Sequence, residues 1–354
     1  MRPSMWRGGL GRFRAGRWSH PLFTALSTCS KEYLMRWQPS ASILLVVVLW
    51  SPFDAAAKLC GDDVQGRDIP CACGDVVVSS LVVTDDPVAR TVCEQDGLIV
   101  RTEAGPTGAT VDLRGATIRG GKHGAGIKIL AGGAPGVRII SSTGPAAIEG
   151  FEDGIFAHGA QSVTLIDGIL AVNNSRDGIR VMASGYEIRN SESQGSGRDG
   201  FSVAGNGYRL SHTRSVGSKR SGYNIMGQNA TLGTPGAGLV AEGSGEFGFN
   251  LMGMGHQLVD CVARAAFKDG VMVMGMHLEI RGCTASDNGG HGIGGMGSDV
   301  MLAGNRALNN NKNGIYVQGP EAHDGGGNSG QGNRGNGVNG PPIDCEIHRL
   351  PCFL

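Results

Sequence analysis

Residues 177–203 read DGIRVMASGYEIRNSESQGSGRDGFSV, and this stretch contains a short motif that returns along the chain. The motif is a polar residue, a glycine and an apolar residue, and it recurs at Gly178, Gly200, Gly222, Gly270, Gly292 and Gly314. The spacings between these glycines are 22, 22, 48, 22 and 22 residues. The interval of 48 divides into 26 and 22 when Gly248 is included, and looser copies occur at Gly126 and Gly154. A fixed period in this range is typical of a solenoid.

Each repeat has the pattern of a strand with one buried face. The residue after the glycine is apolar or aromatic in all nine copies, and the residue two positions further on is apolar in all but one. This period of two places alternate side chains on the same face of a strand. A second apolar row lies twelve residues before the glycine, as at Ile166, Ile188 and Leu210. We therefore expect two or three short strands per repeat, joined by glycine-rich turns and stacked about 4.8 Å apart.

The repeated Asp-Gly-Ile type turns resemble those of the right-handed parallel β-helix proteins of the pectin-lyase-like superfamily, which include NosD-related bacterial envelope proteins. The resemblance covers roughly residues 90–318 and implies an all-β, right-handed parallel β-helix with disulfide-tied ends. It does not define the activity, because one scaffold hosts many functions. We expect residues 58–106 to form an N-terminal cap and first rung, and residues 107–318 to form the β-helix. Residues 319–354 are expected to be a Gly/Asn-rich segment closed by a disulfide.

Residues 1–57 are predicted to be a leader for export. The apolar run Ser42–Trp50 has the length of the core of a secretory signal peptide, and the alanines at 55–57 suit cleavage. Met35 is a candidate for the true start, since it would give a signal peptide of ordinary length. An N-terminal membrane anchor is the alternative. We expect a secreted, periplasmic or cell-surface protein with no transmembrane segment once the leader is removed.

Removal of the leader changes the charge of the chain. Residues 1–57 hold seven of the 31 basic and two of the 31 acidic residues, so 24 basic and 29 acidic residues remain, a net charge of −5. This balance argues against a nucleic-acid partner. All four tryptophans are also lost with the leader. About 300 residues remain, which is enough for one long solenoid domain, and we expect it to be a monomer.

Eight cysteines follow the leader, and their even number predicts disulfides formed in an oxidising compartment. They are Cys60, Cys71, Cys73, Cys93, Cys261, Cys283, Cys345 and Cys352. Cys261 and Cys283 are one 22-residue period apart, so they should meet on adjacent rungs. The last two are expected to close a short loop. A zinc site that includes Cys71 and Cys73 is the competing interpretation of the first group.

A column of charged residues precedes the turn glycines and supplies the candidate catalytic residues. These are Arg176, Arg198, Arg220, Asp177 and Asp199. Stacking would place the cations about 4.8 Å apart, close to one sugar unit of an extended acidic polysaccharide. In the β-helix lyases that the chain resembles, an arginine or lysine abstracts a proton while acidic residues bind calcium, and such a base needs a lowered pKa. The alternative is a solvated turn that keeps the surface soluble.

Other catalytic signatures are incomplete. The triplet around His291 matches one piece of the polygalacturonase signature, but the aspartates that must accompany it are missing. The leading interpretation is therefore a glycan-binding or surface module without catalysis, with a lyase-like enzyme acting on an acidic glycan as the alternative. With no tryptophan available, sugar stacking would depend on tyrosines, namely Tyr186, Tyr208, Tyr223 and Tyr316.

Methionines occur at matching positions of several repeats. Those four residues after a turn glycine are Met182, Met226, Met252, Met274 and Met296. Met254 and Met276 form a second row, with His256 and His277 close by. Thioethers and imidazoles are ligands for Cu(I), and the NosD-related branch is associated with periplasmic copper handling, so a copper-accessory protein is a third possibility.

Two other interpretations of the methionines are packing in the core or along a ladder, and a partner surface. If the residues one and three after the glycine face the core, alternation places the fourth outward. Asparagines four residues before the glycine, as at Asn174, Asn288 and Asn310, predict an internal hydrogen-bonded ladder.

Overall fold

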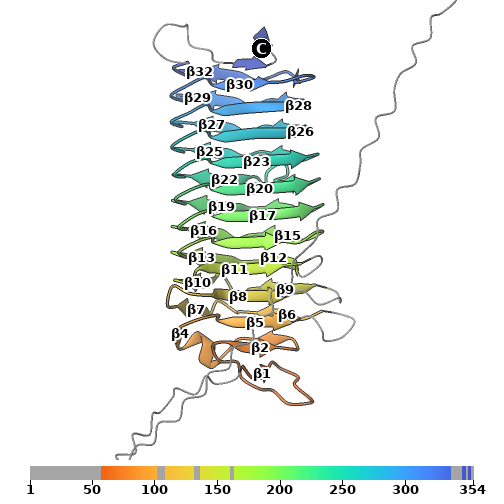
Figure 1. Ribbon diagram of the computed structural model, residues 1–354, viewed down its shortest axis with the longest axis vertical. Helices are drawn as coiled ribbons and strands as arrows, with labels where there is room; N and C mark the ends of the chain where they lie inside the picture. The colour runs from red at the N-terminus through yellow and green to blue at the C-terminus, as the bar shows by residue number, and fades with distance from the viewer. Residues whose placement is uncertain are drawn as a thin grey trace, which may run out of the picture. The chain divides into compact units, whose positions relative to one another are not determined.

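The computed structural model describes residues 57–101, 108–130, 136–159, 163–335, 345–347 and 350–351. Within these residues the chain forms a stack of parallel strands that begins at β1 (Leu59–Cys60) and reaches β32 (Ser329–Gln331) and β33 (Cys345–Ile347) at the other end (Figure 1). A 3-10 turn, η1 (Pro87–Ala89), is the one helical element in this part of the chain. The expected all-β solenoid with rungs of about 22 residues is confirmed.

Each complete rung contributes one strand to each of three parallel ladders. The first ladder consists of β1, β2 (Asp75–Val77), β5 (Leu98–Arg101), β8 (Ala125–Leu130), β11 (Asp153–His158), β14 (Ile179–Met182), β17 (Phe201–Asn206), β20 (Tyr223–Gln228), β23 (Phe249–Met254), β30 (Ile315–Gln318), β33 and the first parts of β26 (Val271–Arg281) and β28 (Ile293–Ala303).

The second ladder follows after a corner. It consists of β3 (Leu81–Val82), β6 (Thr110–Asp112), β9 (Val137–Ile140), β12 (Val163–Asp167), β15 (Glu187–Arg189), β18 (Arg209–Ser211), β21 (Thr231–Leu232), β24 (Gln257–Val259), the later parts of β26 and β28, and β31 (His323–Asp324).

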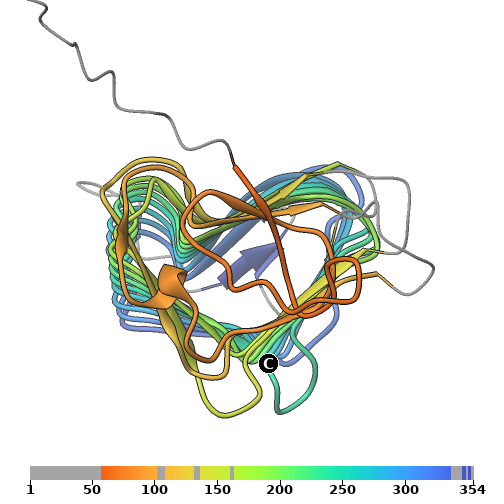
Figure 2. The ribbon, with the colours of Figure 1, turned by 90° about the horizontal axis from the view of Figure 1, so that it is seen from below.

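The third ladder closes each rung and contains 11 strands among the described residues. They are β4 (Val92–Cys93), β7 (Thr117–Gly120), β10 (Ala146–Glu149), β13 (Ile169–Val172), β16 (Glu192–Gln194), β19 (Thr213–Val216), β22 (Leu239–Glu242), β25 (Val262–Arg264), β27 (Thr284–Ser286), β29 (Arg306–Leu308) and β32. One further strand, β34 (Leu350–Pro351), pairs antiparallel to β33. Seen along the stack, the rungs superpose closely (Figure 2).

The inward side chains of the three ladders form one continuous core. Residues one and three after each turn glycine are buried, as predicted, except Gly295, and equivalent side chains lie directly over one another. The rings of Phe201, Tyr223 and Phe249 stack with centroid distances of 4.9 and 4.7 Å. Apolar burial of this kind is the main favourable contribution to folding, and here it continues from rung to rung.

Every complete rung turns three corners, and a residue with positive φ lies at each of them. In the rung that begins at Gly248 these residues are Gly255 (φ 67°), Asp260 (φ 52°) and Ala265 (φ 56°). Glycine adopts this left-handed conformation without steric cost, and asparagine and aspartate tolerate it better than other residues. The corners therefore account for the abundance of glycine, asparagine and aspartate in the turns.

The predicted asparagine ladder is present inside the corner between the third and first ladders. The Asn288 side-chain amide donates to the Asn310 carbonyl oxygen (2.8 Å), and the Asn310 amide donates to Asn333 (2.9 Å). Each amide also donates to a backbone carbonyl, and Asn310 Oδ1 accepts the Asn288 backbone N–H (3.1 Å). Asn174 is buried in the same way and accepts the Phe151 N–H. These side chains satisfy backbone groups that the core would otherwise isolate from water.

Three disulfides lie within the described residues. Cys60–Cys71 and Cys73–Cys93 tie the N-terminal end, and Cys261–Cys283 joins adjacent rungs with a Cα–Cα distance of 4.4 Å, as its spacing predicted. The zinc interpretation is wrong, because Cys71 and Cys73 belong to different disulfides. Cys352 lies outside the described residues, so its link with Cys345 stays a prediction.

The leader assignment stays a prediction too, because residues 1–57, except Ala57, also lie outside the described part of the chain. Among the described residues, the structure contains no helix with the length and apolar character needed to cross a membrane.

Replacing Asn310 with alanine should lower the free energy of unfolding by about 1–3 kcal/mol, because buried partners on both neighbouring rungs lose a hydrogen bond. Urea denaturation followed by circular dichroism measures the effect. Gln228→Ala is the control. Gln228 is exposed at the end of β20 in the first ladder, so this substitution should leave the urea midpoint unchanged. An Asn310→Ala protein as stable as this control would contradict a structural role for the ladder.

Candidate functional site

One corner of the stack differs from its neighbours. The rung from Gly222 to Gly248 has 26 residues instead of 22, and its additional residues form a loop, 233–238, between β21 and β22. The loop closes on itself through a hydrogen bond from the Ala237 N–H to the Thr234 carbonyl (2.8 Å). Asp260, the corner residue of the next rung, accepts the Gly236 N–H (2.8 Å). The loop is therefore held against the stack by its own turn and by one carboxylate.

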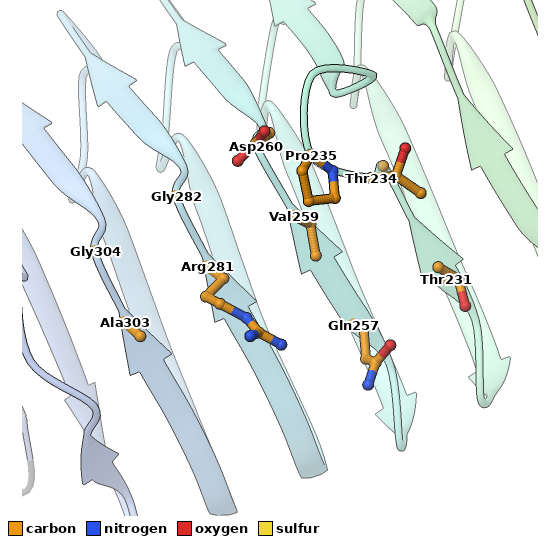
Figure 3. Close-up of a pocket in the computed structure, with 11 residues that line it drawn as sticks. Thr231, Thr234, Pro235, Gln257, Val259, Asp260, Arg281, Gly282, Ala303 and Gly304 are labelled. Carbon is orange, nitrogen blue, oxygen red and sulfur yellow. The ribbon is translucent and has the colours of Figure 1, made fainter.

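This loop borders a groove of about 510 Å³ on the outer face of the second ladder (Figure 3). The lining residues are Thr231, Gly233, Thr234, Pro235, Gln257, Val259, Asp260, Arg281, Gly282, Ala303 and Gly304. Strand register explains how they meet: Thr231 pairs with Gln257, and Val259 with Arg281, which pairs in turn with Ala303. The groove thus extends over four consecutive rungs, a length of about 14 Å at the usual spacing of strands.

The chemistry of the groove is mixed. Thr231, Thr234 and Gln257 contribute two hydroxyls and an amide, and Figure 3 shows Gln257 and Arg281 on neighbouring strands. The Asp260 carboxylate also lines the groove but accepts the Gly236 N–H, and the Arg281 guanidinium is paired with Glu279. The remaining surface is apolar or lacks side chains. Such a lining can bind an extended ligand rich in hydroxyl groups, with the polar groups fixing its orientation. The sequence contained one sign of this site, the four-residue excess within the 48-residue interval.

The predicted charged column lies at the corner between the third and first ladders, and its arginines are held in ion pairs. Each guanidinium points toward the aspartate of the preceding rung. The pairs are Arg176–Asp153 (Nε to Oδ1, 2.9 Å), Arg198–Asp177 (Nε to Oδ1, 3.9 Å) and Arg220–Asp199 (Nη2 to Oδ2, 2.6 Å). Sequence analysis missed Asp153, although it too precedes a turn glycine.

The aspartates of this column join one rung to the next. Asp177 Oδ1 accepts the Asp199 N–H (3.1 Å), and Asp199 Oδ1 accepts the Ser221 N–H (3.1 Å). The hydrogen bonds that Arg176 donates to Asp153, and Arg220 to Asp199, raise the pKa of both arginines. A proton-abstracting arginine needs a shift in the opposite direction. The geometry therefore favours a structural role for the column over the catalytic one.

Burial has a strong effect on Asp177. Its side chain is fully buried, and its Oδ2 accepts no hydrogen bond. Desolvation, together with the nearby Asp199 and Asp153, raises the pKa of Asp177 to about 6, although the Asp199 N–H and Arg198 act against the shift. This carboxyl therefore remains protonated in the folded chain at pH values where it would ionise in the unfolded chain.

This shift should make the stability depend on pH. As pH rises from about 4 to about 7, unfolding releases the Asp177 proton, so the wild-type protein loses up to about 3 kcal/mol relative to Asp177→Asn. The difference in unfolding free energy between the two proteins should thus be most favourable to the wild type below pH 4. Denaturation curves at pH 4, 5, 6 and 7 measure it, with Asp287→Asn, an exposed corner change, as control. A difference that is constant or rises with pH would contradict the assignment.

The residues of the predicted methionine and histidine site do not all face the same way: the methionines lie on the outer face of the first ladder, and His256 faces the core. Met252 pairs with Met274, and Met254 with Met276, on the outer face of the first ladder. Met274 and Met276 are 50% and 49% exposed, so the outward orientation expected from alternation is confirmed and core packing is wrong for this pair.

The histidines do not join the four methionines in one cluster. His256 points inward and is fully buried, where its Nδ1 accepts the Ala230 N–H (3.1 Å) and its Nε2 lies 3.2 Å from the Met252 carbonyl oxygen. Burial lowers the pKa of His256. His277 lies at the corner, with Nδ1 2.7 Å from Asp299 Oδ2.

Three of the four tyrosines cannot serve as the sugar platform that the sequence suggested. Tyr186, Tyr208 and Tyr223 are buried, and the rings of Tyr186 and Tyr208 stack on each other at 5.0 Å. Tyr316 is half-buried and stacks on His291 at 5.5 Å. The expectation is wrong for the first three because their side chains fill the core.

A calcium site, as a lyase would require, has no counterpart in the described part of the chain. No group of three or more histidine, cysteine, aspartate or glutamate side chains there is arranged to hold a metal ion.

Comparison with known protein families agrees with the fold over part of the chain. Residues 228–339 match the family model of the right-handed β-helix region. The three parallel ladders make the chain a parallel β-helix, and residues 228–339 are similar to the right-handed β-helix family. Among solved structures, it is similar to the A-module of the mannuronan C-5 epimerase AlgE4 of Azotobacter vinelandii, with 12% identity, a TM-score of 0.32, and coverage of 67% of this chain and 81% of that one. No curated protein matches the chain.

Proposed function

We propose that the protein is an exported glycan-binding β-helix without catalytic activity, which holds an extended polysaccharide in the groove beside loop 233–238. The groove carries the proposal, because polar side chains from three consecutive rungs, with Ala303 and Gly304 of a fourth, line one hollow of about 510 Å³. The spacing of the rungs, about 4.8 Å, is close to one sugar unit, so successive sugars meet successive strands. Side-chain amides, hydroxyls and guanidinium groups suit the hydroxyls of such a chain.

The state of the charged column supports the absence of catalysis. Its arginines are engaged by carboxylates, and its buried aspartates accept backbone hydrogen bonds from the next rung. A lyase acting on an acidic glycan remains the alternative function. In our proposal Arg176, Arg198 and Arg220 stabilise the stack.

The three disulfides support a location outside the reducing cytoplasm, since such bonds persist in oxidising compartments. We place the protein in the periplasm, on the cell surface or in the medium, acting as a monomer. An acidic polysaccharide is the first ligand to test, because the Arg281 side chain, although paired with Glu279, is half exposed in the groove.

Substituting both Gln257 and Arg281 with alanine should weaken polysaccharide binding by about tenfold or more, since a neutral and a charged hydrogen bond are lost. Affinity electrophoresis or calorimetry with pectate, alginate, glycosaminoglycans and neutral glucans measures the loss. Arg306→Ala is the matched control, because it removes an exposed arginine from the third ladder, away from the groove. Circular dichroism checks that each variant is folded.

Two outcomes would overturn the proposal. One is that the wild type binds none of these polysaccharides, and the other is that Arg306→Ala loses as much affinity as the groove variant. The same mixtures should be followed by ultraviolet absorbance for unsaturated uronate products. A signal that disappears when Arg176, Arg198 and Arg220 are all changed to glutamine would identify a lyase instead.

A further inference from the structure

Four methionines on the outer face of the first ladder take no part in the glycan groove. Met252-Gly253-Met254 ends β23, Met274-Gly275-Met276 lies in β26, and the two segments pair residue for residue. Their four side chains mark the corners of what we call the methionine rectangle (Met252, Met254, Met274 and Met276). Its sides are about 4.8 Å along the stack and about 7 Å along the strands.

The centre of the methionine rectangle contains no side chain, because residues 253 and 275 alternate with the methionines and face the other side of the strands, where a Cβ on Gly253 would lie 2.7 Å from Nε2 of the buried His256. These glycines are fixed by the fold: a Cβ on Gly275 would lie 2.0 Å from the Gly253 carbonyl oxygen, and a Cβ on Gly253 would lie 2.0 Å from that of Gly227. Nothing therefore separates the thioethers across the centre. The three rotatable bonds of each methionine side chain allow its sulfur to turn inward.

The rectangle differs from the rungs on either side. The preceding rung has Met226-Gly227-Gln228 at these positions, and the following rung has Met296-Gly297-Ser298. Of these four rungs, only the two that contain Gly253 and Gly275 have a methionine both before and after the glycine. Since Met274 and Met276 are half exposed, burial of apolar surface does not account for them, and their side chains can be reached from solution.

We propose that the methionine rectangle binds one soft monovalent cation of the Cu(I) or Ag(I) class through thioether sulfur alone. Soft thioether ligands select soft cations over the hard cations that carboxylates prefer. His256 is not a ligand, because it is buried and hydrogen-bonded on the inner side of the wall. The site is on the first ladder and the groove is on the second, so neither proposal depends on the other.

The test uses the full chain without its leader and Ag(I) in chloride-free buffer, together with Cu(I) buffered by bicinchoninate under anaerobic conditions. The wild type should take one ion per chain. The affinity of Met274→Leu/Met276→Leu for the ion should be at least about tenfold lower than that of the wild type. Loss of even an outer-shell partner of a metal ligand typically lowers metal affinity by roughly 10–100-fold. Leucine keeps the volume and polarity of these outward side chains, so the fold should be unchanged.

The matched control is Met182→Leu/Met301→Leu, which removes two methionines outside the rectangle and should keep wild-type affinity. Methionine methyl resonances give a second measure: Ag(I) should shift those of the four rectangle residues and leave Met182 and Met301 in place. The proposal is overturned if the wild type does not compete with bicinchoninate, or if the rectangle variant binds as tightly as the wild type. Polysaccharide affinity should be equal in all three proteins, which separates this site from the groove.

Discussion

The structure depends on one constraint, the parallel hydrogen bonding of each strand to the strand one period further along the chain. Because the register is kept from rung to rung, any residue at a given place in the repeat lies over its equivalent about 4.8 Å away. This stacking brings together chemically similar groups that other folds keep apart. Aromatic rings and asparagine amides gain from it directly. The buried Asp177 and Asp199 repel each other, and the stack tolerates them because backbone N–H groups and arginines from neighbouring rungs compensate.

The same constraint decides where the chain is free to vary. A corner needs only one residue in the left-handed conformation, as Asp260 shows, so additional residues at a corner leave the ladders undisturbed. After the loop 233–238 the register is restored at once, because Leu239 pairs with Thr213. Loops that a rigid scaffold positions are the usual place for binding. Outer strand positions are the second kind of variable surface, and the methionine rectangle uses them.

Much of the fold could be predicted because the period is visible in the sequence. Spacing alone placed Cys261 beside Cys283 and Asn288 beside Asn310, and alternation directed Met274 outward. Several failures occurred where a corner interrupts the alternation. Tyr186, Tyr208 and His256 each follow a left-handed corner residue, which turns the next side chain into the core. The partner of each arginine also depends on side-chain direction at a corner, so the sequence did not show that Arg176 would reach back to Asp153. The four additional residues of the rung from Gly222 to Gly248 were visible in the sequence. Their position beside Val259 and Arg281 depends on how the rungs stack, which the sequence did not show.

A polysaccharide in the groove on the second ladder should protect the lining residues from exchange with solvent. Hydrogen exchange followed by mass spectrometry, with and without a saturating oligosaccharide, measures this protection and locates the contacts without any substitution. We expect slower exchange at residues 231–238, 257–260, 279–282 and 301–304, with no change at residues 176–180 or 198–202. Protection at those turns, or along the outer face of the first ladder, with the groove unprotected, would contradict binding in the groove.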